Sequence, residues 1–399
     1  MATKAEALRT WQGPALLSFG FRPFFLLGAI WAALSMALWL AMLTGTATLP
    51  IRLDPVSWHA HEFLYGYLGA IVAGFLLTAV PNWTERLPFN GWPLAGLVAL
   101  WLLGRLAMAT SAFWPPEAVA LIDLLFPITF AVVISREIII SKNWRNLFVL
   151  VLFGALVTGN AVFHWEAAHG GYAAQGVGLR IGVATAIMLI ALIGGRIVPS
   201  FTRNWLAKQD EGRLPAPPMG RFDRAALLVL LGALGIWVVW PASPVTGVLL
   251  LVAGGFHFIR LGRWAGDRAT AEPLVWVLHV GYAFVPLGAV VISLAILFPQ
   301  IIRVNSAQHL WMAGAIGLMT LAVMTRATLG HTGQALTAGA GTTGIYVLMM
   351  IAVFARLSAD AFPALSASLQ MVSGLAWLAA FCGFTLFYGR LLILPRNSA

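Results

Sequence analysis

Charged residues are scarce in this chain. Asp, Glu, Lys and Arg make up only 10% of its 399 residues, while hydrophobic residues reach 60% and the mean hydropathy is +0.87. Soluble domains carry about 25% charged residues, so this composition excludes an ordinary soluble globular domain. We predict an integral membrane protein with little mass outside the lipid.

Cysteine is also nearly absent. The one cysteine, Cys382, excludes an intramolecular disulfide, a cysteine-rich zinc site, an iron–sulfur cluster and haem attachment through paired cysteines. Any haem must therefore be held non-covalently by His or Met. A cleavable signal peptide is not evident either, because the first apolar run is long enough to span and lacks a small-residue cleavage motif.

Long apolar runs fill most of the chain. Runs such as IVAGFLLTAV and VVISLAILF are continuous rather than alternating, which favours helices over a β-barrel. A helix needs roughly 20 mostly apolar residues to cross a bilayer. We predict an all-α polytopic membrane bundle, a single transmembrane domain over 1–399, with about twelve helices. These fall near 24–43, 60–80, 93–113, 117–134, 146–164, 177–198, 224–240, 244–260, 273–298, 306–326, 338–355 and 364–389.

The charge that is present is mostly positive. The net charge is +10 and the pI is about 10.6, which in a soluble protein would favour a nucleic-acid partner. Here eighteen of the 24 basic residues, including Lys4, Arg9 and Arg396, fall in alternate loops, against three (Arg52, Arg303, Arg356) in the others. Basic residues collect in cytoplasmic loops. We therefore predict a multi-pass protein of the bacterial inner membrane with both termini cytoplasmic, lipid as its surroundings and no nucleic-acid partner.

Eight histidines lie near the ends of the apolar runs. A polar side chain in lipid is expensive, and neutral imidazole is the commonest metal ligand, so each is a site hypothesis. The predicted topology sorts them by membrane side. His59, His61, His164, His169 and His309 belong to the outer side, and His257, His279 and His331 to the inner side. We expect His257 to be interfacial and His169 to lie in an exposed loop.

The run WHAHE opens the second predicted helix. His59 and His61 are two residues apart, so on a regular helix they point to nearly opposite faces and serve different partners. They share one metal only if the helix starts late or has distorted geometry. Glu62 can orient an imidazole by a hydrogen bond. Glu62, Gly66, Ala70 and Gly74 recur every four residues and make a smooth face, which suits either helix packing or a flat ring.

Three further positions carry two interpretations each. His309 shares a stripe with Ala313 and Gly317, which suits an axial haem ligand or a tight helix pair. His279 is either a hydrogen-bonded core residue or a ligand. Arg326 is either a positive anchor or a partner for a carboxylate or haem propionate.

Two arginines inside predicted spans need acidic partners. For Arg105 and Arg180 the candidates are Glu117, Asp123 and Glu166.

Four segments together resemble the NnrS family of bacterial inner-membrane proteins. They are WHAHEFLYGY, IGGRIVPSFTRNWL, PLVWVLHVGYAFVPLG and HLWMAGAIGLMTLAVMTRATLGHTGQ. The resemblance implies a polytopic protein that contains haem and copper and is linked to nitric oxide and nitrosative stress. It carries over the positions His59, His61, Glu62, Arg196, Asn204, His279, His309, Arg326 and His331. This chain has Gln334 where the family often has a basic residue.

Residues and resemblance together predict a protein with haem b and copper. We expect an outer metal region from His59, His61, His309 and His164, and an inner one from His279 and His331, with Glu62 and Arg326 supporting the cofactors. The favoured function is nitric oxide handling or the nitrosative stress response, as an oxidoreductase fed by quinol or another electron donor. The alternatives are a non-catalytic haem-based gas-binding or sensing protein and a membrane transporter. No catalytic residue is assigned.

Overall fold

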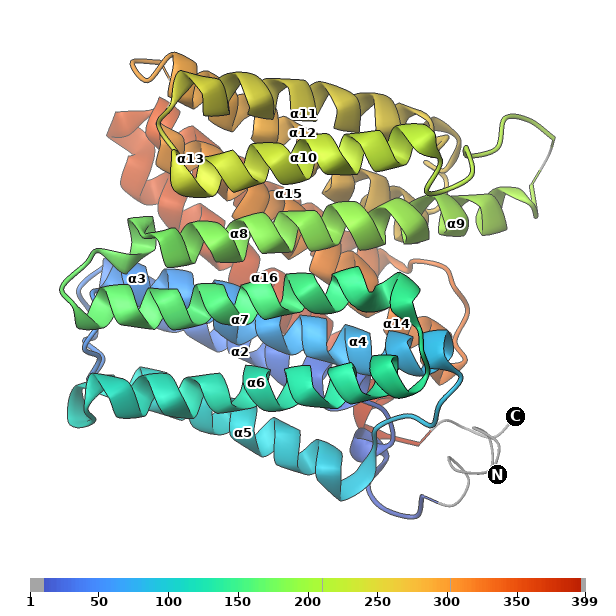
Figure 1. Cartoon of the computed structure of the whole chain (residues 1–399), viewed down its shortest axis with the longest axis horizontal. Helices are drawn as coiled ribbons and strands as arrows, with labels where there is room; N and C mark the ends of the chain where they lie inside the picture. The colour runs from blue at the N-terminus through green and yellow to red at the C-terminus, as the bar shows by residue number, and fades with distance from the viewer. Residues whose placement is uncertain (1–10, 210, 302, 396–399) are drawn as a thin grey trace. The chain divides into compact units, whose positions relative to one another are not determined.

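The computed structural model describes residues 11–209, 211–301 and 303–395, without the side chain of residue 305, and consists of helices and their connections (Figure 1). Lys4, Arg9 and Arg396, which we assigned to the cytoplasmic side, lie outside the described residues. Twelve helical segments are long and apolar enough to cross a membrane, which confirms the predicted all-α polytopic bundle. In chain order their helices are α2 (Phe21–Leu43), α3 (Pro55–His61) with α4 (Leu68–Thr84), α5 (Gly91–Ala109), α6 (Pro116–Ile140), α7 (Leu147–Ala168), α8 (Val177–Leu189) with α9 (Gly195–Leu206), α10 (Arg221–Val239), α11 (Pro244–Gly262), α12 (Pro273–Leu297), α13 (Val304–His309) with α14 (Met319–Thr332), α15 (Ala340–Ala361) and α16 (Ser366–Ile393).

The second span begins earlier than predicted. Asp54 caps it, because one of its carboxylate oxygens accepts hydrogen bonds from the backbone nitrogens of Val56 and Ser57 at 3.0 and 2.9 Å. Pro55 then occupies the first turn, where its missing N–H costs nothing. The predicted start near residue 60 is therefore wrong, and both histidines of WHAHE lie inside the helix.

Three spans contain a π-helical segment: η2 (Glu62–Tyr67), η6 (Ile190–Gly194) and η8 (Leu310–Leu318). These are the second, sixth and tenth spans, and each is 72% buried over its most apolar window, against 28–56% for the other nine described spans. A π-turn adds a residue and rotates the side chains that follow, and such turns often mark functional sites. In η2, Glu62 and Gly66 still share a face, because a Cβ on Gly66 would lie 3.0 Å from Glu62 Oε2.

The first compact unit comprises residues 1–182, 327–334 and 384–399. Within it α5, α6 and α7 lie side by side (Figure 1), and α2 packs on α4. Gly74 lets α4 approach Phe24 and Phe25, since a Cβ there would lie 3.0 Å from each side chain. Arg22, at the start of α2, donates to the carbonyl oxygens of Leu392 and Leu394 at 3.0 and 2.8 Å and so holds the end of α16.

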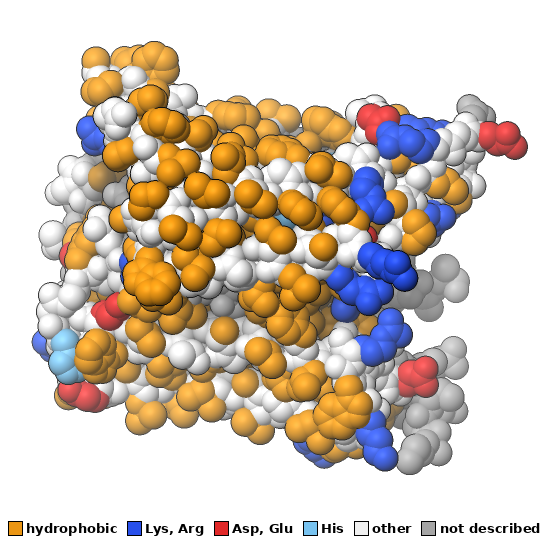
Figure 2. All heavy atoms as spheres, turned by 45° about the horizontal axis from the view of Figure 1, so that its top comes forward, with side chains coloured by type: hydrophobic (Ala, Val, Ile, Leu, Met, Phe, Trp, Pro, Cys, Tyr) orange, Lys and Arg blue, Asp and Glu red, His pale blue; other side chains and the backbone are white. Residues whose placement is uncertain are grey.

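The second compact unit comprises residues 183–326 and 335–383. Its helices α10, α11 and α12 lie side by side (Figure 1). The Trp311 indole donates to the carbonyl oxygen of Val285 at 3.0 Å, and Trp237 meets the same indole edge-on at 5.4 Å. On the face drawn in Figure 2, hydrophobic side chains cover the flanks of the helices and Lys and Arg lie near helix ends, as lipid-facing helices require.

Candidate metal centre

A buried polar cluster lies in the first unit, where five spans, α2 among them, meet. His61 and Glu62 come from the junction of α3 and η2, Arg105 from α5, Asp123 from α6, and Asn160 and His164 from α7. Ionisable groups within apolar spans have no water to solvate them, so they must satisfy one another. The exposed fraction of each of these residues other than His164 is at most 4%, and the His164 side chain is 10% exposed.

Glu62 accepts hydrogen bonds from three side chains. Arg105 Nη1 donates to Glu62 Oε1 and Oε2 at 2.7 and 2.6 Å, and Trp31 Nε1 donates to Oε2 at 2.8 Å. His61 Nδ1 lies 3.0 Å from Oε1. A carboxylate held this way fixes the orientation of the imidazole and directs its Nε2 away from Glu62. The prediction that Glu62 can orient an imidazole agrees with this geometry.

Asp123 is the second carboxylate of the cluster. Arg105 Nη2 donates to its Oδ1, and Asn160 Nδ2 donates to its Oδ2 at 2.7 Å. The same Oδ2 lies 3.1 Å from His164 Nε2 and 3.3 Å from His61 Nε2. Because the Asn160 amide group donates to Asp123, the Asn160 Oδ1 atom is directed at His61 Nε2, at 2.9 Å. One carboxylate oxygen, one amide oxygen and two imidazole nitrogens thus converge.

The formal charges in this cluster do not cancel with both imidazoles neutral. Glu62 and Asp123 carry one negative charge each, and Arg105 carries one positive charge. A buried excess charge is costly unless a counter-charge accompanies it. The cluster therefore favours one further positive charge beside Asp123, supplied by a proton on an imidazole or by a metal cation.

The donor atoms meet the requirements of a metal site. One ligand atom each from His61, Asp123 and His164 lie within 4.8 Å of one another. Two imidazoles and a carboxylate suit copper, zinc or ferrous iron, because these ions take nitrogen and oxygen donors with positions left open. The three ligands come from three spans, so only the folded bundle forms the site.

The structure places the other predicted outer ligands elsewhere. The His59 ring stacks on Trp39 at 4.5 Å and lies 4.7 Å from Phe63, so His59 and His61 contact different neighbours, as their spacing predicts. His309 ends α13 in the second unit.

The small-residue stripe below His309 does not form an open groove. The π-helix η8 changes its spacing, and a Cβ on Gly314 would meet Phe284 while one on Gly317 would meet Met349 and Trp377. Neighbouring side chains therefore lie against Gly314 and Gly317, and the role of His309 as a haem ligand stays a prediction.

The predicted inner residues fall in both units. His279 Nε2 lies 2.8 Å from Thr202 Oγ1, and Arg326 lies 4.1 Å above the Phe201 ring, all within the second unit. His331 belongs to the first unit and packs 5.2 Å from the Phe21 ring.

His257 is fully buried and contacts Tyr282, while its expected position at the membrane interface stays a prediction. His169 is exposed, as expected, and its Nδ1 lies 2.8 Å from the carbonyl oxygen of Trp165.

Two further residues of the cluster have signals in the sequence. Arg105 was expected to need an acidic partner with Asp123 among the candidates, and the structure pairs them. Asn160 stands four residues before His164, which is one helical turn, so both share a face of α7. What the sequence did not reveal is that α5, α6 and α7 bring these residues to His61.

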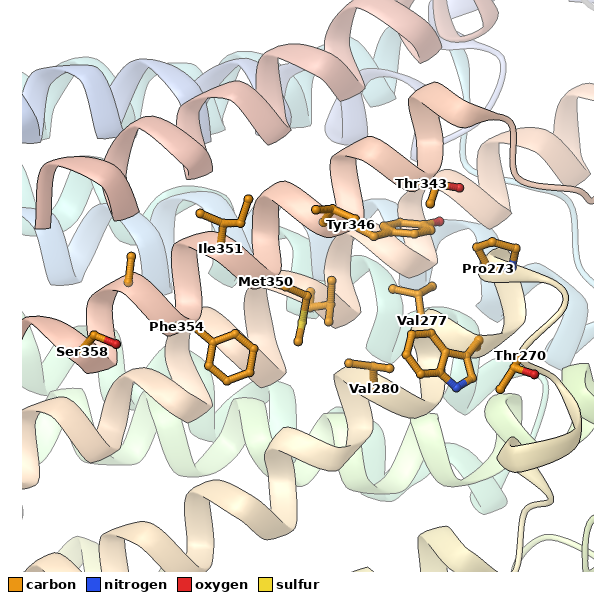
Figure 3. A pocket seen from close by; sticks show the side chains of 14 residues that line it. Thr270, Pro273, Val277, Val280, Thr343, Tyr346, Met350, Ile351, Phe354 and Ser358 are labelled. Carbon is orange, nitrogen blue, oxygen red and sulfur yellow. The ribbon is translucent and has the colours of Figure 1, made fainter. Parts of the chain in front are cut away.

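An apolar cavity of about 600 Å³ lies in the second unit, between α12 and α15 (Figure 3). Val277 and Val280 line it from α12, and Met350 and Phe354 from α15. Its polar lining residues are near its ends, with Thr343 at one and Ser358 at the other (Figure 3). The described residues that line it include no histidine or carboxylate.

Comparison with known proteins gives a single result. The model of the family described as NnrS protein matches residues 15–396. No curated protein matches the chain.

Proposed function

Since this chain belongs to the NnrS family, we propose that it is a haem- and copper-binding inner-membrane protein that handles nitric oxide, with copper held by His61, Asp123 and His164. The family is linked to nitric oxide. The observation that supports the copper assignment is the convergence of two imidazole nitrogens on Asp123 Oδ2, at 3.1 and 3.3 Å. When bound there, a copper ion would bind a diatomic gas or pass single electrons.

The protein's own residues prepare this site in three ways. Glu62 fixes His61 through Nδ1, so that Nε2 can offer its lone pair to a metal. Arg105 occupies Asp123 Oδ1 and leaves Oδ2 directed at the histidines. The excess negative charge of the cluster attracts a cation. Burial excludes water, which strengthens each of these electrostatic interactions.

Haem b is a proposal that the family supports. His309 and His331 are the proposed candidates for its axial ligands, as the predicted site residues. A quinol is the proposed electron donor, because the protein lies in the membrane where quinols dissolve. The proposed orientation keeps both termini in the cytoplasm, in line with the basic residues of alternate loops.

Metal analysis of the protein in lipid nanodiscs tests the copper assignment. We expect one copper per chain in the wild type and in His169→Ala, which removes an exposed histidine outside the cluster. His61→Ala and His164→Ala should lose most of the copper while they still elute as monodisperse protein. Unchanged copper content in both variants would refute the site, and iron or zinc in its place would refute copper as the metal.

The gas-handling part of the proposal needs a separate readout. Nitric oxide added to the copper-loaded protein should change its electron paramagnetic resonance spectrum, and the change should be absent in His61→Ala. Turnover of nitric oxide with a quinol analogue would distinguish an oxidoreductase from a gas-binding sensor, which would show the spectral change without consumption.

A further inference from the structure

A second buried polar group lies in the second unit and takes no part in the proposed function. Asp223 from α10, His257 and Arg260 from α11, and Tyr282 from α12 are connected by hydrogen bonds inside the spans. The exposed fraction of each is at most 2%. Buried polar groups that are costly to place in lipid mark a function by default.

The hydrogen bonds of this group fix the position of the phenolic proton. Arg260 Nη1 donates to Tyr282 Oη at 2.8 Å, and a guanidinium has no lone pair with which to accept. The phenol must therefore donate its own hydrogen to its other partner, His257 Nδ1, also at 2.8 Å. His257 Nε2 faces the carbonyl oxygen of Ala226 at 3.2 Å, so Nε2 carries the ring hydrogen and Nδ1 is the basic nitrogen.

Tyr65 in the first unit has a different kind of partner. Its hydroxyl donates to the carbonyl oxygen of Gly178 at 2.7 Å. A carbonyl oxygen accepts a hydrogen bond but is too weak a base to take the proton. An oxidised phenol is a strong acid that must release its proton, so an imidazole partner makes oxidation far easier than a carbonyl partner does.

We propose that Tyr282 is a one-electron redox site whose oxidation is coupled to transfer of its phenolic proton to His257. The phenol gives one electron to a strong one-electron oxidant, its O–H bond breaks, and an N–H bond forms at Nδ1. The products are a neutral tyrosyl radical, an imidazolium and the reduced oxidant. Return of one electron and the same proton restores the phenol.

A buried ion pair lies beside His257. Asp223 Oδ1 accepts from Arg260 Nε at 2.7 Å, so the guanidinium beside His257 is already paired. Arg260 Nη1 also donates at 2.8 Å to the carbonyl oxygen of Ala191, which lies in the π-helix η6. That carbonyl oxygen also accepts the helical hydrogen bond of the Gly195 backbone nitrogen, so Arg260 is its second donor. The carboxylate of Asp223 offsets the charge of Arg260, so the proton on His257 does not face an unpaired cation.

Trp264 is an aromatic neighbour through which an electron can leave Tyr282. The Trp264 ring meets Tyr282 edge-on with the ring centres 4.5 Å apart, and it lies 6.5 Å from the His279 ring. Trp264 is itself buried, with an exposed fraction of 1%. Close aromatic rings allow an electron to cross the apolar interior in short steps.

Flash oxidation of the full-length protein in nanodiscs tests the proposal. The probe is tris(bipyridine)ruthenium with persulfate as electron acceptor, and the readout is electron paramagnetic resonance after freezing. We expect a long-lived neutral tyrosyl signal in the wild type. Tyr282→Phe should remove most of it, whereas Tyr65→Phe should leave it unchanged. An equal loss in both variants, or no loss in Tyr282→Phe, overturns the proposal.

Three further measurements distinguish loss of the redox site from a folding defect. His257→Gln keeps an acceptor but removes the base, so radical yield should fall and the solvent deuterium isotope effect on its formation should disappear. Wild-type protein labelled with ¹⁵N-histidine should show a nitrogen coupling to the radical, and absence of that coupling overturns the proposal without any variant. His61→Ala should keep the radical, which separates this result from the fate of the copper site.

Discussion

Arg105 Nη1 contacts both carboxylate oxygens of Glu62, at 2.7 and 2.6 Å. Its Nη2 donates at the same time to Asp123 Oδ1. One guanidinium therefore positions the carboxylate on each side of His61, and α5 contributes to the metal centre without supplying a ligand. The planar, always-charged guanidinium fits this double contact in a way that a lysine ammonium does not.

Replacing Asp123 should destabilise the protein strongly. Asp123→Asn puts an amide NH2 group where a carboxylate oxygen now accepts from Arg105 Nη2 or Asn160 Nδ2, so two buried donors face each other, which costs on the order of 3 kcal/mol. The matched control is Asp267→Asn, whose carboxylate pairs with Arg213 at a surface where both side chains are more than half exposed. The hydrogen bond from Arg213 lowers the pKa of Asp267, so this pair is ionised at neutral pH.

The measurement is thermal unfolding in detergent at pH 7. The control should change stability by about 1 kcal/mol or less, because exposed ion pairs contribute little. Equal midpoints for Asp123→Asn and the wild type would contradict the account of the cluster as a set of mutually dependent charges.

Gly66 and Gly69 should respond in opposite ways to one methyl group. A Cβ on Gly66 would lie 2.4 Å from Arg105 Nη1, whereas a Cβ on Gly69 meets nothing within 4 Å. Gly66→Ala should push Arg105 away from Glu62, destabilise the fold by about 1–3 kcal/mol and lower copper content. Gly69→Ala should be neutral or stabilise by up to about 1 kcal/mol, because alanine suits a helix better than glycine.

Cysteine labelling in spheroplasts tests the proposed orientation. In a Cys382→Ser background, His169→Cys and Lys208→Cys each place one thiol at an exposed position outside the predicted apolar runs. A membrane-impermeant maleimide should label His169→Cys in intact spheroplasts and Lys208→Cys only after lysis. The reverse pattern would show that the termini lie outside.

Haem content tests the remaining cofactor proposal. A pyridine haemochrome assay of His309→Ala and His331→Ala, with His169→Ala as control, should show which of these histidines are axial haem ligands. Loss of haem in either of the first two supports that histidine as a ligand. Unchanged haem in both would exclude these histidines, and a wild type without haem would exclude haem b altogether.

Helical class and span number were accessible from sequence because each span is a local property. About 20 apolar residues must form a helix in lipid whatever surrounds them. The pairing of Arg105 was also foreseeable, since a lone charge in a span requires a partner. The burial of His257 was not, because the hydrogen bonds that allow it to be buried come from Tyr282 on another helix and from a carbonyl on a third.

The early start of the second span shows the limit of hydropathy. Asp54 and Pro55 are a recognisable cap, but they precede the apolar run, and a window of apolar residues overlooks them. The π-turns could not be predicted from the sequence for a different reason. They insert a residue without any distinctive composition, so the π-helix η8 after His309 had no signal in the sequence.

Sequence alone determined that this chain forms a set of helices in lipid, because the length of each apolar run and its scarcity of charge act on each segment separately. Tertiary structure decided which histidines share a centre. His61 and His164 meet at Asp123 although about a hundred residues separate the two histidines, since only packing of α3, α6 and α7 sets the distance between their side chains.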